Sequence, residues 1–314
     1  MWVCRSSTAA TELDTSPGGG VSTELRFLVL LISLSAAAQQ SPDPGFTPQI
    51  PNPPFAPGAG PLVLLDEAHH NFHTVEGRFS GFVKLARAAG YRVEPSRAPF
   101  AAESPGPARI LVIANALHPR NHNHWQLPTP SAFKSGEIQA LVDWINGGGS
   151  LLLIADHMPF AGAASVLGHA LGVRFANGYV RQEPRAGSPD VFTRGEALRN
   201  HTITRGIGSV ATFTGSAFQA PGAEPLLVLG PRYIALLPDQ AGQFTDETPR
   251  ISVAGWYQGA VLRKGKGRVA VFGEAAMFSA QLTGAGAAMG MNHPKAKENA
   301  QFVVNVLRWL SGAD

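Results

Sequence analysis

The stretch DWINGGGSLLLIADHMPFAGAASVLGHALGV, residues 143–173, contains the alternation that decides the fold. Its first residues complete a helical pattern over 135–146, and three glycines then lead into the apolar run SLLLIA at 150–155. A second helical pattern follows and ends at Gly172. A helix, a buried strand and another helix in this order are typical of βαβ units, in which helices connect parallel strands.

The same alternation continues on both sides of this stretch. Short apolar runs predict buried strands, and apolar residues at helical spacing predict helices between them. The predicted strands are 61–65, 91–95, 109–114, 150–155 and 267–273, and the predicted helices run from Phe79 to Gly90, over 135–146, through 166–171 and over 295–310. We therefore expect an α/β fold with a doubly wound, flavodoxin-like, mostly parallel sheet and helices on both faces.

Residues 173–262 have a looser pattern. Short segments such as VRFANGYV, PLLVLG and YIALLP predict a strand-rich insertion or extension, and the order of its strands stays open. Clear α/β elements precede and follow this region. Residues 61–312 are therefore expected to form one domain.

The N-terminal region has the layout of a secretory signal peptide. Arg26 precedes the apolar run FLVLLISLSAAA, and small residues at 36–38 offer a cleavage site. The run is about 12 residues long, well short of the ~20 that a membrane-spanning helix needs. We expect a signal peptide over 1–38, with Val21 as an alternative start, no stable membrane span after cleavage, and a secreted or periplasmic protein. Residues 39–60 are rich in proline and glycine and predict an extended linker.

Charge and cysteine content exclude some classes of function. The chain has 25 Lys and Arg against 22 Asp and Glu, and the net charge of +3 is too small and too dispersed to predict a nucleic-acid partner. Cys4, the only cysteine, lies in the predicted signal peptide. A mature chain without a thiol cannot use a cysteine nucleophile, a disulfide or a thiolate metal site.

Polar residues follow four of the predicted core strands at the point where each strand ends. They are Asp66 and Glu67, Asn115, Asp156 and His157, and Glu274. Because parallel strands place their carboxyl ends at one edge of the sheet, where ligands bind, we expect these side chains to gather there. The sequence therefore predicts a site for a polar small molecule or carbohydrate.

Each of these residues also has a purely structural interpretation. An Asp or Asn after a strand is often a helix N-cap, worth about 1 kcal/mol, and this interpretation is favoured for Asn115. For the adjacent pairs Asp66-Glu67 and Asp156-His157 function is favoured, because capping needs one acceptor only. Glu274 stays open between the two interpretations, since an acid also stabilises the start of a helix.

The segment DEAHHNFH at 66–73 and a later histidine-rich loop offer further candidates. His69 and His73 lie four residues apart and, with Asp66, predict a site for a divalent metal such as zinc, although an H-E-x-x-H motif is absent. The loop HPRNHNHW at 118–125 is long enough to favour a functional loop, with a solvated turn as the alternative. His70 and His118, with Asn115, are the expected substrate-binding residues.

The stretch 143–173 resembles the class I glutamine amidotransferase-like superfamily. NHTITRGIGSV, residues 200–210, is similar to a His-Pro-Ile-Thr-x-Gly segment of its trehalose-utilisation-type branch, with Thr202 at the proline position. The resemblance covers most of 61–312 and is closest to secreted bacterial members of unestablished activity. It implies a cysteine on the elbow after the strand, where this chain has Asp156 and His157. The departure excludes a cysteine-dependent glutaminase.

Two classes of function follow from these residues. The first is a hydrolase of a polar small molecule or carbohydrate, with Asp156 or Glu274 as general base, His157 as acid or polariser and Glu67 as a further catalytic candidate. A metal at the site would lower the pKa of bound water. The alternative is a domain that binds a ligand without turnover, or that serves only in assembly.

Overall fold

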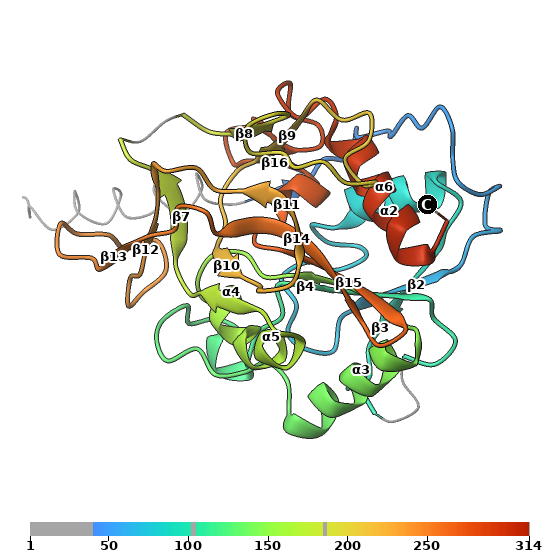
Figure 1. Ribbon diagram of the computed structural model, residues 1–314, viewed down its shortest axis with the longest axis horizontal. Helices are drawn as coiled ribbons and strands as arrows, with labels where there is room; N and C mark the ends of the chain where they lie inside the picture. Colours follow the sequence, from blue (N-terminus) through green and yellow to red (C-terminus); the bar gives the residue numbers. More distant parts are fainter. Residues whose placement is uncertain (1–39, 102–104, 185–186, 314) are drawn as a thin grey trace, which may run out of the picture.

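The computed structural model describes residues 40–101, 105–184 and 187–313. The predicted signal peptide lies outside these ranges. The fold is α/β, with a mixed nine-stranded sheet between helices (Figure 1). Within the described ranges no helix is long and apolar enough to cross a membrane.

Five parallel strands form one half of the main sheet, in the order β3-β2-β4-β5-β15. They are β2 (Leu62–Asp66), β3 (Arg92–Ser96), β4 (Ile110–Ala114), β5 (Ser150–Ile154) and β15 (Gly267–Phe272). Every residue of β4 and β5 is buried, as expected for central strands covered on both faces. The five predicted core strands are thereby confirmed.

Antiparallel strands form the other half, so the sheet is mixed and not mostly parallel. They are β14 (Tyr257–Lys264), β10 (Ala217–Gln219), β6 (Arg174–Ala176) and β11 (Glu224–Val228). Only Gly265 and Lys266 connect β14 to β15. A connection of two residues permits an antiparallel hairpin, whereas a parallel crossover needs a dozen residues or more.

The region 173–262 also forms two small sheets. The first pairs β7 (Tyr179–Gln182) with β12 (Tyr233–Leu236) and β13 (Arg250–Ser252), and the second pairs β8 (Asp190–Thr193) with β9 (Ser209–Thr212). The strand-rich extension expected from the sequence is therefore present. It adds strands to the main sheet, and Tyr179 of β7 stacks on His157, three residues beyond the carboxyl end of β5.

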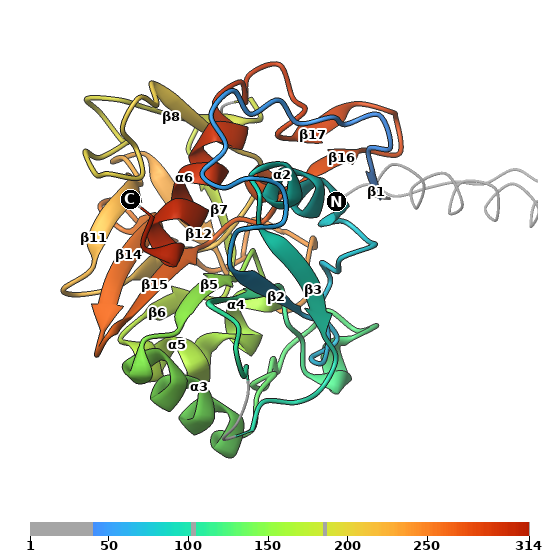
Figure 2. The same ribbon diagram turned by 90° about the vertical axis from the view of Figure 1, so that its right-hand side faces the viewer.

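Helices cover the sheet through two separate hydrophobic clusters. α2 (Ser80–Ala88) and α6 (Asn299–Ser311) bury their apolar residues in one cluster, and α3 (Ser135–Gly147) and α5 (Ser165–Leu171) in the other (Figure 2). Successive residues of β4 alternate between these clusters: Ile110 belongs to the first and Leu111 to the second. This is the two-sided burial that period-2 alternation in a strand produces.

Residues 40–60 lie against the domain and do not form an extended tether. β1 (Ser41–Pro42) pairs with β16 (Ala280–Leu282), which pairs in turn with β17 (Ala288–Gly290). Phe46, Ile50 and Phe55 pack against the first hydrophobic cluster. Burial of these apolar side chains stabilises the docked segment, in spite of its proline and glycine content.

Candidate ligand site

The first polar group at the carboxyl edge of the sheet is a buried ion-pair triad. His69 Nδ1 lies 2.9 Å from both carboxylate oxygens of Asp66, and His69 Nε2 lies 2.9 Å from Oε1 of Glu137 on α3. Each ring nitrogen faces an acceptor, so the ring donates on both sides as an imidazolium. All three residues are buried.

The pKa values of the triad follow from this geometry. Burial alone would lower the pKa of His69, but hydrogen bonds and charge attraction from Asp66 and Glu137 outweigh it and raise that pKa. Burial likewise opposes ionisation of Glu137, and the hydrogen bond from His69 outweighs it and lowers the Glu137 pKa. Glu137 also accepts the backbone N–H groups of Phe100 and Lys134. The triad therefore fastens the β2–α2 loop to α3.

The predicted metal ligands do not come together around one point. Asp66 and His69 bind each other, whereas His73 turns towards Asn115, whose Nδ2 lies 3.2 Å from His73 Nδ1. In the described part of the chain no group of three His, Cys, Asp or Glu residues is placed to hold a metal ion. The four-residue spacing would align His69 and His73 only on a helix, and residues 69–73 are not helical.

Asn115 connects the β2–α2 loop to the end of β5. Its Nδ2 donates to His73, and its Oδ1 accepts the backbone N–H of Asp156 at 2.9 Å. Its backbone is left-handed, with φ of 52°, a conformation that Asn adopts more readily than most residues. Asn115 thus acts through loop structure, the interpretation favoured from the sequence, although it joins two strand ends and caps no helix.

His73 is a neutral, fully enclosed histidine. Burial, followed by the charges of Arg78 and His157, lowers its pKa to about 3. The hydrogen bond from Asn115 assigns the lone pair to Nδ1 and the proton to Nε2. Nε2 has no hydrogen-bond partner among the described residues.

Asp156 and Glu274 are neighbours, but both are committed to backbone groups. Asp156 accepts the N–H groups of His157 and Ala275 and the hydroxyl of Thr214. Glu274 accepts the first N–H groups of η2 (Ala276–Phe278). Burial raises the pKa of Glu274 well above its usual value, and the Asp156 charge raises it further. Both acids are buried, so neither is open to solvent.

His157 differs from the predicted catalytic residues Asp156 and Glu274, which are both buried. It is half-buried, and its Nδ1 lies 2.7 Å from the carbonyl oxygen of Met158. The carbonyl can only accept, so Nδ1 carries a proton, and in the neutral ring the lone pair lies on Nε2. Its ring stacks on Tyr179 with centroids 4.2 Å apart and an interplanar angle of 14°.

Three other predicted residues lie around this centre. Exposed His70 packs on His122 of the 118–125 loop, with ring centroids 4.9 Å apart. His118 caps η1 (Pro119–Asn121) by accepting the N–H of Arg120. Glu67 accepts the backbone N–H of Val75 and pairs with Arg97, so it supports the loop and stands apart from Asp156. The 118–125 loop contacts His70 through His122 and His157 through Trp125.

A cavity of about 180 Å³ opens beside Asp156 and His157. Two of its wall residues connect it to the predicted pair, because Thr214 donates to Asp156 and Tyr179 stacks on His157. The lining mixes rings with hydrogen-bonding side chains and includes Tyr179, Arg181, Gln182, Asp190, Thr214 and Phe244. We call this space the β7 cavity.

Sequence reasoning missed Glu137 and the residues of the β7 cavity. Glu137 lies in α3, which was predicted from the apolar residues on one face of the helix, and Glu137 is not one of those residues. An acid at the third position of a helix is nevertheless a recognisable signal, since it can accept the N–H of the residue before the helix. No comparable local signal marks Tyr179, Thr214 and Phe244, which come from separate segments of the strand-rich extension.

Comparisons with known proteins support the fold alone. No protein-family model and no curated protein matches the chain. Among solved structures, the N-terminal domain of mmIFT52 is similar with a TM-score of 0.57 and 15% identity, over 79% of this chain and 97% of that one. A putative ThuA-like protein from Bacteroides uniformis gives a TM-score of 0.48 and 13% identity, over 83% of this chain and 95% of that one. An exo-β-1,4-mannosidase from an Opitutaceae bacterium gives a TM-score of 0.38 and 15% identity, over 68% of this chain and 31% of that one.

Proposed function

We propose that this chain binds a small carbohydrate in the β7 cavity, beside Asp156 and His157. The observation that carries the proposal is the combination of rings and hydrogen-bonding side chains around one space at the end of β5. Ligand sites are typically concave, with apolar or aromatic walls and a few polar groups that fix orientation. The volume of about 180 Å³ is below the range of drug-sized ligands and suits a single sugar ring.

The rings of the cavity are held in fixed orientations. Tyr179 stacks on His157 and meets Phe244 edge-on, with centroids 5.1 Å apart and an interplanar angle of 87°. Phe244 is 44% exposed, so one ring remains available to a ligand. An aromatic face packs against the C–H groups of a sugar, while Gln182 and Asp190 supply partners for hydroxyl groups.

The position of the cavity fits the type of fold that we propose. The parallel order β3-β2-β4-β5-β15 corresponds to the order 2-1-3-4-5 of flavodoxin-like, doubly wound sheets. Such sheets bind ligands outside the carboxyl ends of their strands. We propose membership of the amidotransferase-like superfamily on the same basis, with the ligand site displaced towards the strand-rich extension.

A hydrolytic activity is the second candidate, and His157 is the observation that favours it. The bond from Nδ1–H to the Met158 carbonyl leaves the Nε2 lone pair free to accept a proton from water. Asp156 holds the backbone of His157 through its N–H and so positions the ring. In this proposal His157 is the general base, and Asp156 and Glu274 are positioning residues.

A binding experiment with neutral sugars tests the first proposal. Calorimetric titration with a panel of monosaccharides and disaccharides should identify a ligand, and Phe244→Ala should weaken its binding by about 1 kcal/mol, or roughly fivefold. Val166→Ala is the matched control, because Val166 is also exposed, at 51%, and lies on α5 outside the cavity. Equal affinity of wild type and Phe244→Ala would overturn the proposed location.

A separate assay decides between binding and turnover. Release of nitrophenol from aryl glycosides and esters should fall by about 10² or more in His157→Gln if His157 is the general base. Binding of the sugar without any product, or product formation unchanged in His157→Gln, would remove the hydrolytic candidate and leave the binding proposal standing.

We also propose that the mature chain is exported to the periplasm or the medium. The support is the arrangement of Arg26 before the apolar run and small residues at 36–38. N-terminal sequencing of the protein recovered outside the cytoplasm should begin at Gln39, and recovery with Met1 or Val21 intact would contradict export by cleavage.

A further inference from the structure

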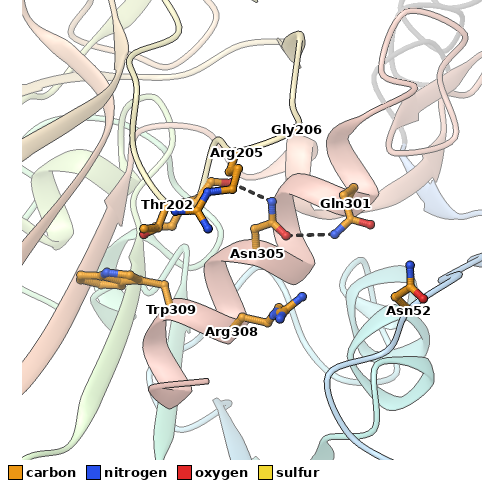
Figure 3. Close-up of a pocket in the computed structure, with 9 residues that line it drawn as sticks. Asn52, Thr202, Arg205, Gly206, Gln301, Asn305, Arg308 and Trp309 are labelled. Carbon is orange, nitrogen blue, oxygen red and sulfur yellow. Dashed lines mark hydrogen bonds between the residues drawn. The ribbon is translucent and has the colours of Figure 1, made fainter. Parts of the chain in front are cut away.

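A second cavity, of about 620 Å³, lies along α6 on a part of the molecule separate from the β7 cavity. Figure 3 shows side chains from three segments around it: the docked segment before β2, the turn at 202–206, and α6 itself. The residues that matter here are Asn52, Arg205, Gln301, Asn305, Arg308 and Trp309. We call this space the α6 cavity.

The charge of the α6 cavity has one sign. Arg205 and Arg308 line it and no Asp or Glu does. Within the described ranges, neither guanidinium makes an ion pair or a hydrogen bond to protein. Glu298, the acid at the N-cap of α6, is already occupied by the backbone N–H groups of Gly208 and Ser209. Among the described residues, no carboxylate therefore neutralises the two arginines that face the cavity.

The amide side chains of the cavity are arranged in a chain of hydrogen bonds. Asn305 Nδ2 donates to the carbonyl oxygen of Ile203 at 2.8 Å, and Gln301 Nε2 donates to Asn305 Oδ1 at 2.9 Å (Figure 3). The Gln301 carbonyl oxygen remains as an acceptor for a ligand hydroxyl. Trp309 is 3% exposed and forms a rigid part of the wall.

We infer that the α6 cavity binds a small polyhydroxylated anion, a sugar acid or a sugar phosphate, with its oxyanion on Arg205 and Arg308. A guanidinium is a planar fork that matches the two oxygens of a carboxylate or phosphate. The amides of Asn52 and Gln301 can donate to and accept from hydroxyl groups. A bare oxyanion would leave most of a 620 Å³ space unfilled, so the ligand carries a polar body as well.

Titration of the full chain with four probes tests this site. Glucuronate and glucose 6-phosphate carry the expected oxyanion on a sugar, inorganic phosphate carries the oxyanion alone, and glucose carries the sugar alone. We expect one of the first two to bind at least about tenfold more tightly than phosphate or glucose, and its affinity to fall as salt increases. The preferred probe identifies carboxylate or phosphate as the natural group.

Paired variants place the binding at the α6 cavity. Replacement of both arginines, Arg205→Gln with Arg308→Gln, should weaken the preferred probe by at least about tenfold. Arg263→Gln, at an exposed arginine on β14, is the control for the loss of one positive charge, as in each single variant, and should bind like wild type. Phe244→Ala should also leave this binding unchanged, because Phe244 belongs to the β7 cavity.

Several results would overturn the inference. The first is that neither glucuronate nor glucose 6-phosphate binds with a Kd below about 1 mM. The second is that glucose or inorganic phosphate binds as tightly as the preferred probe. The third is that the double arginine variant binds the preferred probe as tightly as wild type does. If circular dichroism shows that the double variant is unfolded, each single variant should still weaken the preferred probe, and wild-type affinity in both would equally overturn the inference.

Discussion

Replacement of Glu137 by glutamine should destabilise the domain by removing one carboxylate of the buried triad. Glu137 Oε1 faces His69 at 2.9 Å, and both side chains are buried. Loss of one partner from a buried ion pair costs about 3–5 kcal/mol. Glutamine keeps the shape and one acceptor, and Asp66 still pairs with His69, so we expect about 2 kcal/mol, the range of a charge-assisted hydrogen bond. That corresponds to roughly 4–8 °C in Tm for a domain of this size.

The effect should depend on pH in a defined direction. The pKa of His69 is raised above 6.5, so the stability from its charge is complete below that pH and is lost as pH rises through the folded-state value. The pKa of Glu137 is lowered from 4.5, so its contribution is complete above 4.5 and is lost as pH falls through the folded-state value. The difference between wild type and Glu137→Gln should therefore be largest from about pH 4.5 to 6.5 and decline at alkaline pH.

Urea unfolding followed by circular dichroism measures this difference at each pH. Asp143→Asn is the matched control, since Asp143 is an exposed acid on the same helix and should change stability by less than about 0.5 kcal/mol. The proposed triad would be refuted if Glu137→Gln were as stable as wild type at about pH 6, or if the difference grew as pH rose above the His69 pKa.

Three further substitutions test packing and electrostatics in the domain. A Cβ on Gly81 of α2 would lie 2.8 Å from the backbone nitrogen of Ala280, so Gly81→Ala should lower the free energy of unfolding in urea by about 1–3 kcal/mol. A Cβ on Gly136 of α3 would meet nothing within 4 Å, so Gly136→Ala should raise the free energy of unfolding by about 0.5–1 kcal/mol. Because the pKa of Glu274 is raised, wild type loses stability as pH rises above 4.5 towards the folded-state pKa. Glu274→Gln should remove this dependence of unfolding free energy on pH, which amounts to at most about 1.4 kcal/mol per pH unit. The same pH dependence in wild type and Glu274→Gln would contradict a raised pKa at Glu274.

The main features of the α/β core were predictable because they depend on short-range patterns. The predicted helix over 135–146 corresponds to α3, and Gly172 adopts the left-handed conformation that ends α5. The predicted start at 295 was early, because α6 begins at Asn299 and the preceding residues form turns. The antiparallel half of the sheet was not predictable, since pairing between distant short strands leaves no periodic signal.

The candidate site shows the same division between local and distant information. Residues directly after strands do gather at one edge, and Asn115 joins two of these ends as the parallel arrangement requires. The partners that decide their chemistry were out of reach of the sequence. His69 meets Glu137, which lies 68 positions away, and Asp156 meets Thr214, which lies 58 positions away.

These contacts explain why the polar residues at the strand ends do not themselves surround a ligand. Asp66, Asp156 and Glu274 all accept backbone N–H groups, and a carboxylate that satisfies such donors stabilises a loop most effectively when it is buried. Once buried, it cannot also contact a ligand directly. Recognition then depends on side chains that these acids hold in place, as Asp156 holds Thr214 at the wall of the β7 cavity. Phe244→Ala should consequently weaken binding of a sugar through loss of a direct contact. Changes at Asp156 should weaken it through loss of the cavity wall that Asp156 supports.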